Sequence, residues 1–329
     1  MNLRLTIFVL ILINLLVHRP ESEAAPQGHP APPPSEAADH VILFVLEGVD
    51  RQSLKTGPMP ALSRLAKEGA ATWSAGTVTS SSRLPAMASL LTGLPVEKHG
   101  ITWDTFEFSR GYPRPPTIFD YLDLSGGRDS AIFFMDESLY QLAKPEPYTD
   151  YQVCGPLKPE CSPDRLVSYI KQYIRKADSG QGYGHAILAL PHLLVVHLPD
   201  GARAGIEHGW SSGSYRTALR SVDQAMESVL AIFKNHGLLT RTTVFVTSLS
   251  GTGAAPGQST TASTLVPWIA SGAGIKHGHA IHQPVSIVDT GATVLRALRL
   301  ETHTEWDSRA VEEIFRDAPS VATIATKGR

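Results

Sequence analysis

Residues 40–50 read His-Val-Ile-Leu-Phe-Val-Leu-Glu-Gly-Val-Asp, an unbroken apolar run that ends in an acid and a glycine. Such a run predicts a core strand of an α/β sheet, because a strand that is buried on both faces is apolar at every position. The acid, Glu47, would then lie at the carboxyl edge of the sheet, where sheets of this class bind their ligands.

A second informative stretch, residues 82–101, reads Ser-Arg-Leu-Pro-Ala-Met-Ala-Ser-Leu-Leu-Thr-Gly-Leu-Pro-Val-Glu-Lys-His-Gly-Ile. It predicts a helix, with Pro85 in the first turn and Gly93 just past the end. The N-terminus of such a helix presents free N–H groups, which favour an anion.

Strand and helix patterns alternate along the rest of the chain. Strands are predicted at 130–135, 192–198, 242–247 and 265–270, and helices at 59–68, 117–124, 163–176, 211–235 and 286–298. This alternation predicts an α/β fold, a three-layer αβα sandwich with a mostly parallel central sheet.

The composition is that of one large domain. The chain has 329 residues and a formal net charge of −2, which is enough chain for a single full core. The near-neutral balance gives no electrostatic reason to expect nucleic acid as a partner. We expect the domain to span 39–318, with a small loop-rich cap at 136–183 and a weakly patterned tail at 319–329.

Residues 1–24 have the pattern of a secretory signal peptide. Arg4 supplies the charge, residues 5–17 are apolar, and Ser22-Glu23-Ala24 is a small-x-small cleavage site. The apolar run is too short for a stable membrane span, and the alternative is an uncleaved N-terminal anchor. We therefore expect a secreted or periplasmic protein, with a Pro/Ala linker at 25–38.

The chain has two cysteines, Cys154 and Cys161. In an exported chain, a pair this close in sequence predicts a disulfide. A zinc site built on them would need two further ligands nearby, and none is evident.

The stretch 40–101 resembles the alkaline phosphatase superfamily, in particular its type I phosphodiesterase and nucleotide pyrophosphatase branch. Members typically read strand, Asp-Gly, a Thr or Ser nucleophile at the mouth of a helix that ends Leu-Thr-Gly, and then His-Gly-Ile. Further similar segments are 196–200, 205–210, 246–251, 266–269, 272–275 and 289–290. The resemblance implies a reaction in which two metal ions, usually zinc, clamp a phosphoryl or sulfuryl group and activate the hydroxyl nucleophile.

The reactive positions of the family depart from this pattern. In chain order the seven positions fall on Glu47, Arg83, Ala202, Ile206, Leu249, Ser250 and, by a less certain spacing, Gln258. Only Glu47 keeps a ligating group, and it stands where the family has Asp. Arg83 falls on the nucleophile, and a guanidinium can neither lose a proton nor attack.

Two explanations of Glu47 and Arg83 remain open. Arg83 could stand in for the lost cation by pairing with Glu47, or it could point into solvent while Glu47 is hydrated or paired elsewhere. Two groups of metal-capable residues also stand out, 197/207/208 and 277/279/282. The first fits no known spacing of ligands, and the second falls in a Gly-rich segment where a solvated loop is expected.

The sequence therefore predicts a non-catalytic binding or scaffold protein without a cofactor, whose partner is an unknown protein or a small anionic ligand. One alternative is a metal-dependent phosphodiesterase, phosphatase or sulfatase whose two zinc ions use relocated ligands, for example Asp200 in place of Ala202. Another alternative is a metal-free anion-binding module that uses Arg83 and the helix N-terminus.

Overall fold

A computed structural model describes residues 38–78, 82–143, 149–151, 161–183, 186–253, 263–302 and 304–316. They belong to one compact unit of the chain, Pro34–Arg329. Within the described residues, no helix combines the length and apolar character needed to cross a membrane. The signal segment, the C-terminal tail and Cys154 lie outside them, so the predicted signal peptide and disulfide remain predictions.

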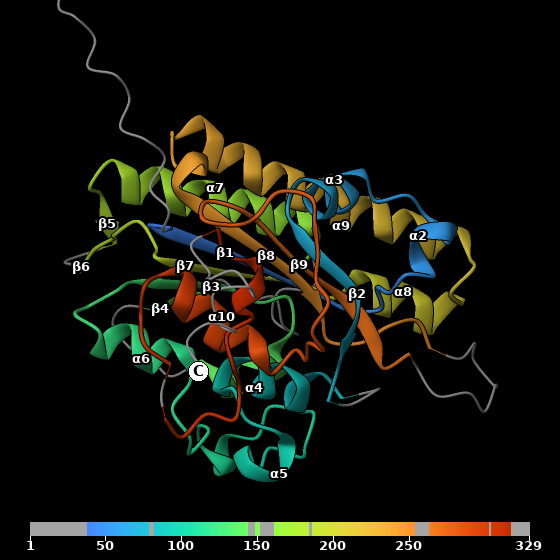
Figure 1. Cartoon of the computed structure of the whole chain (residues 1–329), viewed down its shortest axis with the longest axis horizontal. Coiled ribbons are helices and arrows are strands. Elements are labelled where there is room, and N and C mark those ends of the chain that lie inside the picture. Colours follow the sequence, from blue (N-terminus) through green and yellow to red (C-terminus); the bar gives the residue numbers. More distant parts are fainter. Residues whose placement is uncertain are drawn as a thin grey trace, which may run out of the picture. The chain divides into compact units, whose positions relative to one another are not determined.

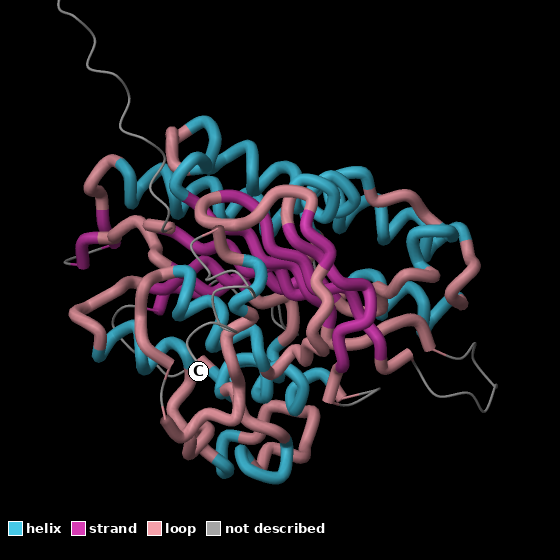
Figure 2. Tube along the Cα trace, viewed as in Figure 1, coloured by secondary structure: helices cyan, strands magenta, loops and turns pink. Residues whose placement is uncertain are grey.

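The centre of the domain is a sheet of eight described strands in the order β10-β2-β9-β8-β1-β7-β3-β4 (Figures 1 and 2). The strands are β1 (His40–Leu46), β2 (Ala70–Gly76), β3 (Ser130–Phe133), β4 (Thr149–Tyr151), β7 (Leu193–Leu198), β8 (Thr242–Ser248), β9 (Leu265–Gly272) and β10 (His279–Ala280). Only β9 runs antiparallel to its neighbours in this sheet. The predicted mostly parallel sheet is confirmed, with β1 between its parallel partners β7 and β8.

Helices cover both faces of the sheet, which confirms the three predicted layers (Figure 1). One face carries α3 (Pro60–Glu68), α7 (Pro163–Asp178) and α9 (Gly213–Asn235), and the other carries α4 (Arg83–Thr92), α6 (Ile118–Leu124) and α10 (Asp289–Ala297). Alternate residues of β1 enter the two cores: Leu43 packs with α4 and α10, whereas Phe44 packs with α7 and α9. Burial on both faces is the reason that β1 is apolar at every position from Val41 to Leu46.

Two described elements of the segment 136–183 join the main sheet and its core. Strand β4 extends the main sheet beside β3, with Ser130 paired to Thr149. Helix α7 buries Leu166, Ile170 and Ile174 in the same core as β1. The apolar face of α7 needs a large apolar surface, and the sheet provides it.

The remaining described elements are short. They include α2 (Ser53–Thr56), α5 (Val96–His99), α8 (Asp200–His208), a hairpin of β5 (Gly182–Tyr183) and β6 (Ala186–Ile187), and four 3₁₀ turns, the last of which is η4 (Glu312–Ile314). Helix α8 follows β7 directly and packs on α9, so it reaches the carboxyl edge of the sheet.

Candidate functional site at the carboxyl edge of the sheet

The segments that follow β1, β7 and β8 meet at the carboxyl edge of the sheet. The backbone N–H of Leu249 donates to the last carbonyl of β1 at 2.8 Å, and that of Ala202 donates to the Glu47 carbonyl at 3.0 Å. The Ser250 carbonyl accepts from Gly48 N at 3.0 Å. Four positions that the resemblance assigns to the metal centre are therefore brought together.

The side chains at these positions offer almost no metal ligands. Ala202 and Leu249 are buried and apolar, and Ile206 is 65% exposed on α8. Ser250 uses its hydroxyl oxygen to accept from Gly48 N at 3.2 Å. Gln258 lies outside the described residues.

Glu47 and Arg83 form an ion pair, which is one of the two arrangements that the sequence left open. Arg83 Nε lies 2.5 Å from Glu47 Oε1, and Nη2 lies 3.1 Å from Oε2. The contact is bidentate, which is the geometry that a guanidinium offers to a carboxylate. Arg83 is the first residue of α4, and Asp104 accepts the next backbone N–H, that of Leu84, at 2.7 Å. This hydrogen bond caps the helix end that carries Arg83.

Arg83 also binds a second carboxylate, which the sequence analysis did not single out. Its Nη1 donates to Asp136 Oδ2 at 2.7 Å, while Ser138 donates to Asp136 Oδ1 through its backbone N–H and its hydroxyl. Arg203 of α8 donates to the Met135 carbonyl and lies 3.5 Å from Asp136 Oδ2. Asp136 comes directly after the predicted strand 130–135. This position was the feature of the sequence that indicated a place at the carboxyl edge.

His197 completes the surroundings of Glu47 from within β7. It is fully buried, and its Nε2 lies 2.6 Å from Glu47 Oε1. The Met135 N–H donates to its Nδ1 at 3.4 Å. A neutral imidazole with its hydrogen on Nε2 satisfies both contacts. Glu207 and His208 lie at the exposed end of α8, so the structure does not bring 197/207/208 together.

The charges of this cluster stabilise one another. Burial by itself raises the pKa of Glu47, but the hydrogen bond from His197 and the charge of Arg83 outweigh it and hold that pKa below its ordinary value. Burial likewise raises the pKa of Asp136, and Arg83 with the Ser138 hydrogen bonds reverses the effect. Both carboxylates are therefore ionised at neutral pH, with Arg83 as their shared cation.

The pKa of Asp200 shifts in the opposite direction. Burial raises its pKa, and the charge of Arg203 offsets this only in part. Its Oδ2 is buried and has no hydrogen-bond partner within the part of the chain that the structure describes. Among the described acids at this edge, Asp200 is thus the one with a buried oxygen left over.

A two-metal centre does not fit these residues. Three of the inherited ligand positions, Ala202, Ile206 and Leu249, have side chains without a donor atom. The oxygens of Glu47 already accept from Arg83 and His197. One leftover oxygen on Asp200 cannot supply the several ligands that each ion requires. The arrangement supplies electrostatic stabilisation, and the position that the resemblance assigns to the nucleophile holds a guanidinium.

Comparisons with known proteins agree with the architecture. The model of the family "type I phosphodiesterase / nucleotide pyrophosphatase" matches residues 41–317. The murine ectonucleotide pyrophosphatase/phosphodiesterase 5, an inactive threonine-to-alanine variant in complex with AMP, superposes with a TM-score of 0.64 at 13% identity, covering 84% of this chain and 100% of its own. The human protein of the same name gives a TM-score of 0.63 at 13% identity, with coverages of 84% and 100%.

A 2-O GAG sulfatase, BT1596, gives a TM-score of 0.63 at 12% identity, covering 83% of this chain and 73% of its own. Among curated proteins, none matches the chain in sequence. At these identities the structural matches show a shared fold, and function has to be inferred from the site.

Proposed function

Because the chain belongs to the type I phosphodiesterase/nucleotide pyrophosphatase family, we propose that it is a non-catalytic binding member of that family. The observation that carries the proposal is Arg83, which stands at the position that the resemblance assigns to the nucleophile and binds both Glu47 and Asp136. A guanidinium stays protonated and cannot attack phosphorus or sulfur. The charge of Arg83 also lies next to Glu47, the one position of the family's metal site that keeps a carboxylate in this chain.

Binding without turnover is a state that this fold can adopt. The murine relative is described as an inactive variant in complex with AMP. The present chain differs at more positions than the nucleophile, because Ala202, Ile206 and Leu249 also replace ligands. The reading in which Arg83 itself captures an anion is not favoured, since three of its N–H groups already donate to Glu47 and Asp136.

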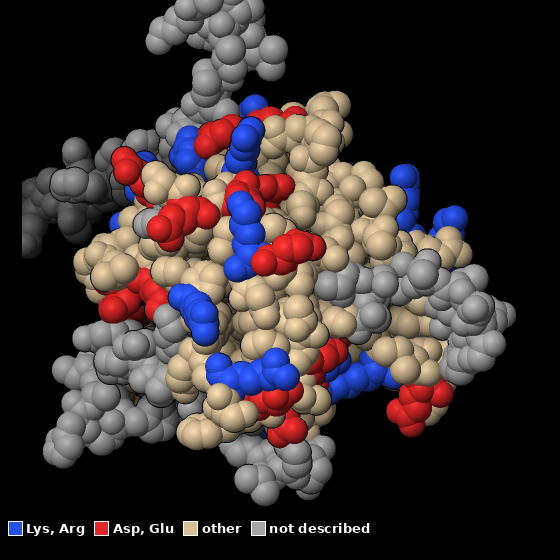
Figure 3. Space-filling model, turned by 90° about the horizontal axis from the view of Figure 1, so that it is seen from below, with Lys and Arg blue, Asp and Glu red and all other residues tan. Residues whose placement is uncertain are grey.

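We place the protein outside the cytoplasm, on the basis of the signal pattern in residues 1–24. We propose a small anion or a protein surface as the partner, and we do not propose a nucleic acid. On the face drawn in Figure 3, acidic and basic side chains are interspersed rather than gathered into a basic field. Tight binding to a nucleic acid requires such a field.

The test is a hydrolysis assay of the purified protein with added Zn²⁺. We expect no turnover of p-nitrophenyl phosphate, its diesters or its sulfate above buffer, because no hydroxyl nucleophile is activated. Arg83→Thr is expected to stay inactive, since it restores the hydroxyl but none of the ligands. Turnover that is abolished both by a chelator and by Glu47→Gln would overturn the proposal, as would zinc bound at stoichiometry and lost on Glu47→Gln.

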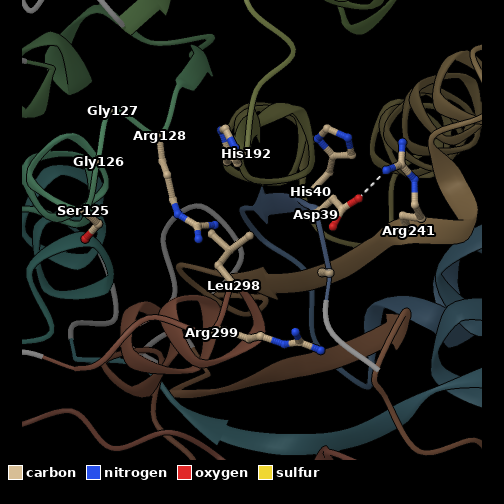
Figure 4. A pocket seen from close by; sticks show the side chains of 11 residues that line it. Asp39, His40, Ser125, Gly126, Gly127, Arg128, His192, Arg241, Leu298 and Arg299 are labelled. Atoms are coloured by element: carbon tan, nitrogen blue, oxygen red, sulfur yellow. Dashed lines mark hydrogen bonds and ion pairs between the residues drawn. The ribbon is translucent and has the colours of Figure 1, made fainter. Parts of the chain in front are cut away.

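A second observation favours a small anion as the ligand. A pocket of about 640 Å³ opens where the predicted core strands begin, at the edge opposite Glu47 (Figure 4). Its lining includes Asp39, His40, Arg128, His192, Arg241 and Arg299. Arg241 pairs with Asp39. Arg128 and Arg299 form no ion pair with any described residue, and they extend into the pocket from the segment before β3 and the segment after α10.

The backbone of Arg299 supports this reading. It is the only described non-glycine residue with a positive φ, at 58°. This conformation costs energy in a residue with a Cβ, and such strain often marks ligand sites. Burial lowers the pKa values of His40 and His192, so both are neutral at pH 7 and the arginines supply the positive charge.

We expect AMP and inorganic sulfate to bind this pocket, measured by calorimetry at low salt. Arg128→Ala/Arg299→Ala should weaken AMP binding by at least about tenfold, because each charge-assisted hydrogen bond contributes roughly 1.5–3 kcal/mol. Arg220→Ala, at an exposed position on α9, is the matched control and should bind as the wild type does. Binding that the double variant leaves unchanged, or no binding at all, would refute the anion pocket.

A further inference from the structure

Three metal-capable side chains from two distant segments meet at the edge of the sheet that β10 forms. His279 lies in β10, His282 lies just after it, and Glu313 lies in η4. Glu313 Oε2 is 3.0 Å from His279 Nε2 and 3.4 Å from His282 Nδ1. One ligand atom from each residue lies within 4.8 Å of the other two, and no other such group occurs among the described residues.

These separations suit a small tetrahedral cation. Zinc binds imidazole nitrogen and carboxylate oxygen at about 2.0–2.2 Å, so neighbouring ligand atoms of a tetrahedron lie roughly 3.3–3.5 Å apart. The separations of Glu313 Oε2 from His279 Nε2 and His282 Nδ1, 3.0 and 3.4 Å, are close to that edge length. The imidazole rings of His279 and His282 meet at 70° with centroids 5.7 Å apart, so they converge rather than stack.

The surroundings hold the three ligands in place. Glu313 Oε1 accepts from the backbone N–H groups of His282 and Gln283 at 3.1 and 2.8 Å, which leaves Oε2 for the histidines. His279 is part of β10 and donates its backbone N–H to Gly69 at 2.9 Å. Hydrogen bonds to the outer oxygen of a carboxylate orient the oxygen that faces a metal.

The segment that carries Glu313 is itself tied to the chain before β10. Lys276 N donates to the Ile314 carbonyl at 2.8 Å, and Arg316 N donates to Gly274 at 2.9 Å. Ile314 and Phe315 are buried in the core on one side of the sheet. The C-terminal turn therefore presents Glu313 from a position that packing determines.

This cluster is separate from the carboxyl edge at Glu47. Four strand spacings separate β10 from β1, which corresponds to roughly 19 Å at about 4.8 Å each. None of its residues is among the positions that the resemblance assigns to the two-metal centre. A solvated loop was expected for 277/279/282 because these histidines lie in a Gly-rich segment, and Glu313, which joins two of them, is remote in the sequence.

We propose that His279, His282 and Glu313 bind one divalent cation of the zinc class, with water completing the coordination. Two imidazoles and a carboxylate suit zinc. Imidazole also binds copper and nickel, so this ligand set is not selective for zinc alone. His282 is 78% exposed at its side chain, while His279 and Glu313 are each 23% exposed, so an ion can enter from solvent. The bound ion joins the C-terminal turn to β10.

The experiment is a calorimetric titration of Zn²⁺ into full-length protein stripped with a chelator, together with thermal unfolding with and without the ion. We expect one site per chain and a Tm that rises with zinc. His282→Asn and Glu313→Gln should each weaken binding by at least about tenfold and remove the rise in Tm. His277→Asn is the matched control, because His277 is exposed and lies outside the cluster, and it should behave as the wild type does.

Glu47→Gln provides a second control. Zinc binding that persists in Glu47→Gln and disappears in His282→Asn assigns the ion to this cluster, whatever the outcome for catalysis. Unchanged affinity in His282→Asn and Glu313→Gln would overturn the proposal, as would equal losses in His277→Asn. Thermal unfolding of each metal-free variant checks that a loss of binding does not reflect loss of the fold.

Discussion

Replacing Arg83 with methionine is expected to lower the free energy of unfolding by about 3–5 kcal/mol, because the change leaves a buried carboxylate without its cation. Glu47 is 4% exposed and Asp136 shares the same guanidinium. Methionine fills much of the space of the arginine stem, so the loss reports on charge more than on packing. Urea unfolding of wild type and variant at pH 7 measures it.

The double variant Arg83→Met/Glu47→Gln distinguishes this explanation from simple loss of contacts. Glutamine is neutral, and its oxygen can still accept from His197 Nε2, which lies 2.6 Å from Glu47 Oε1. The double variant should therefore be more stable than Arg83→Met alone, since the unpaired buried charge is the costly state. A double variant that is equally or less stable would show that Arg83 does not act as the counter-charge.

The ion pairs of Arg83 with Glu47 and Asp136 also predict how the free energy of unfolding depends on pH. The pKa values of Glu47 and Asp136 are lower in the folded chain than their ordinary values. The two carboxylates therefore contribute their full stabilisation above their pKa values in the unfolded chain, roughly pH 4. This stabilisation is lost as the pH falls through their lower pKa values in the folded chain. The gap in stability between wild type and Arg83→Met should be widest near pH 7 and should narrow below about pH 4.

Gly48→Ala is expected to cost about 2–5 kcal/mol of unfolding free energy. Gly48 has a φ of +68°, and an added Cβ would lie 2.6 Å from Ala202 N and 2.8 Å from the ring of Trp210. A left-handed conformation costs an L-residue roughly 1–2 kcal/mol, and overpacking adds about 1–3 kcal/mol. The clash falls between β1 and α8, so it displaces the backbone that carries Glu47.

Gly100→Ala is the matched control for this prediction. Gly100 has a similar φ of +71°, and a Cβ there would meet nothing within 4 Å. It should therefore show the conformational cost alone, about 1–2 kcal/mol. Chemical unfolding of both variants isolates the contribution of the close approach, and equal losses at the two positions would mean that the contact between β1 and α8 relaxes freely.

Several elements could be predicted from local sequence because the pattern and the burial agree. β1 and β7 are apolar except for one histidine each, β8 carries Val-Phe-Val at its centre, and all three strands are buried at every position. By contrast, β2 has the sequence Ala-Ala-Thr-Trp-Ser-Ala-Gly, which carries little strand pattern. It becomes a strand because it lies between β9 and β10, so its backbone hydrogen bonds, rather than its side chains, decide its structure.

The sequence by itself determined the fold class, the family and the residue types at the positions that the family uses for its reaction centre, since burial periodicity and short motifs are local properties of the chain. Only the tertiary structure decided the partners of those residues. His197 reaches Glu47 across 150 positions of sequence, and Glu313 reaches His279 and His282 across 34 and 31 positions. No local pattern encodes such contacts, because they depend on which strands become neighbours and on where each one ends.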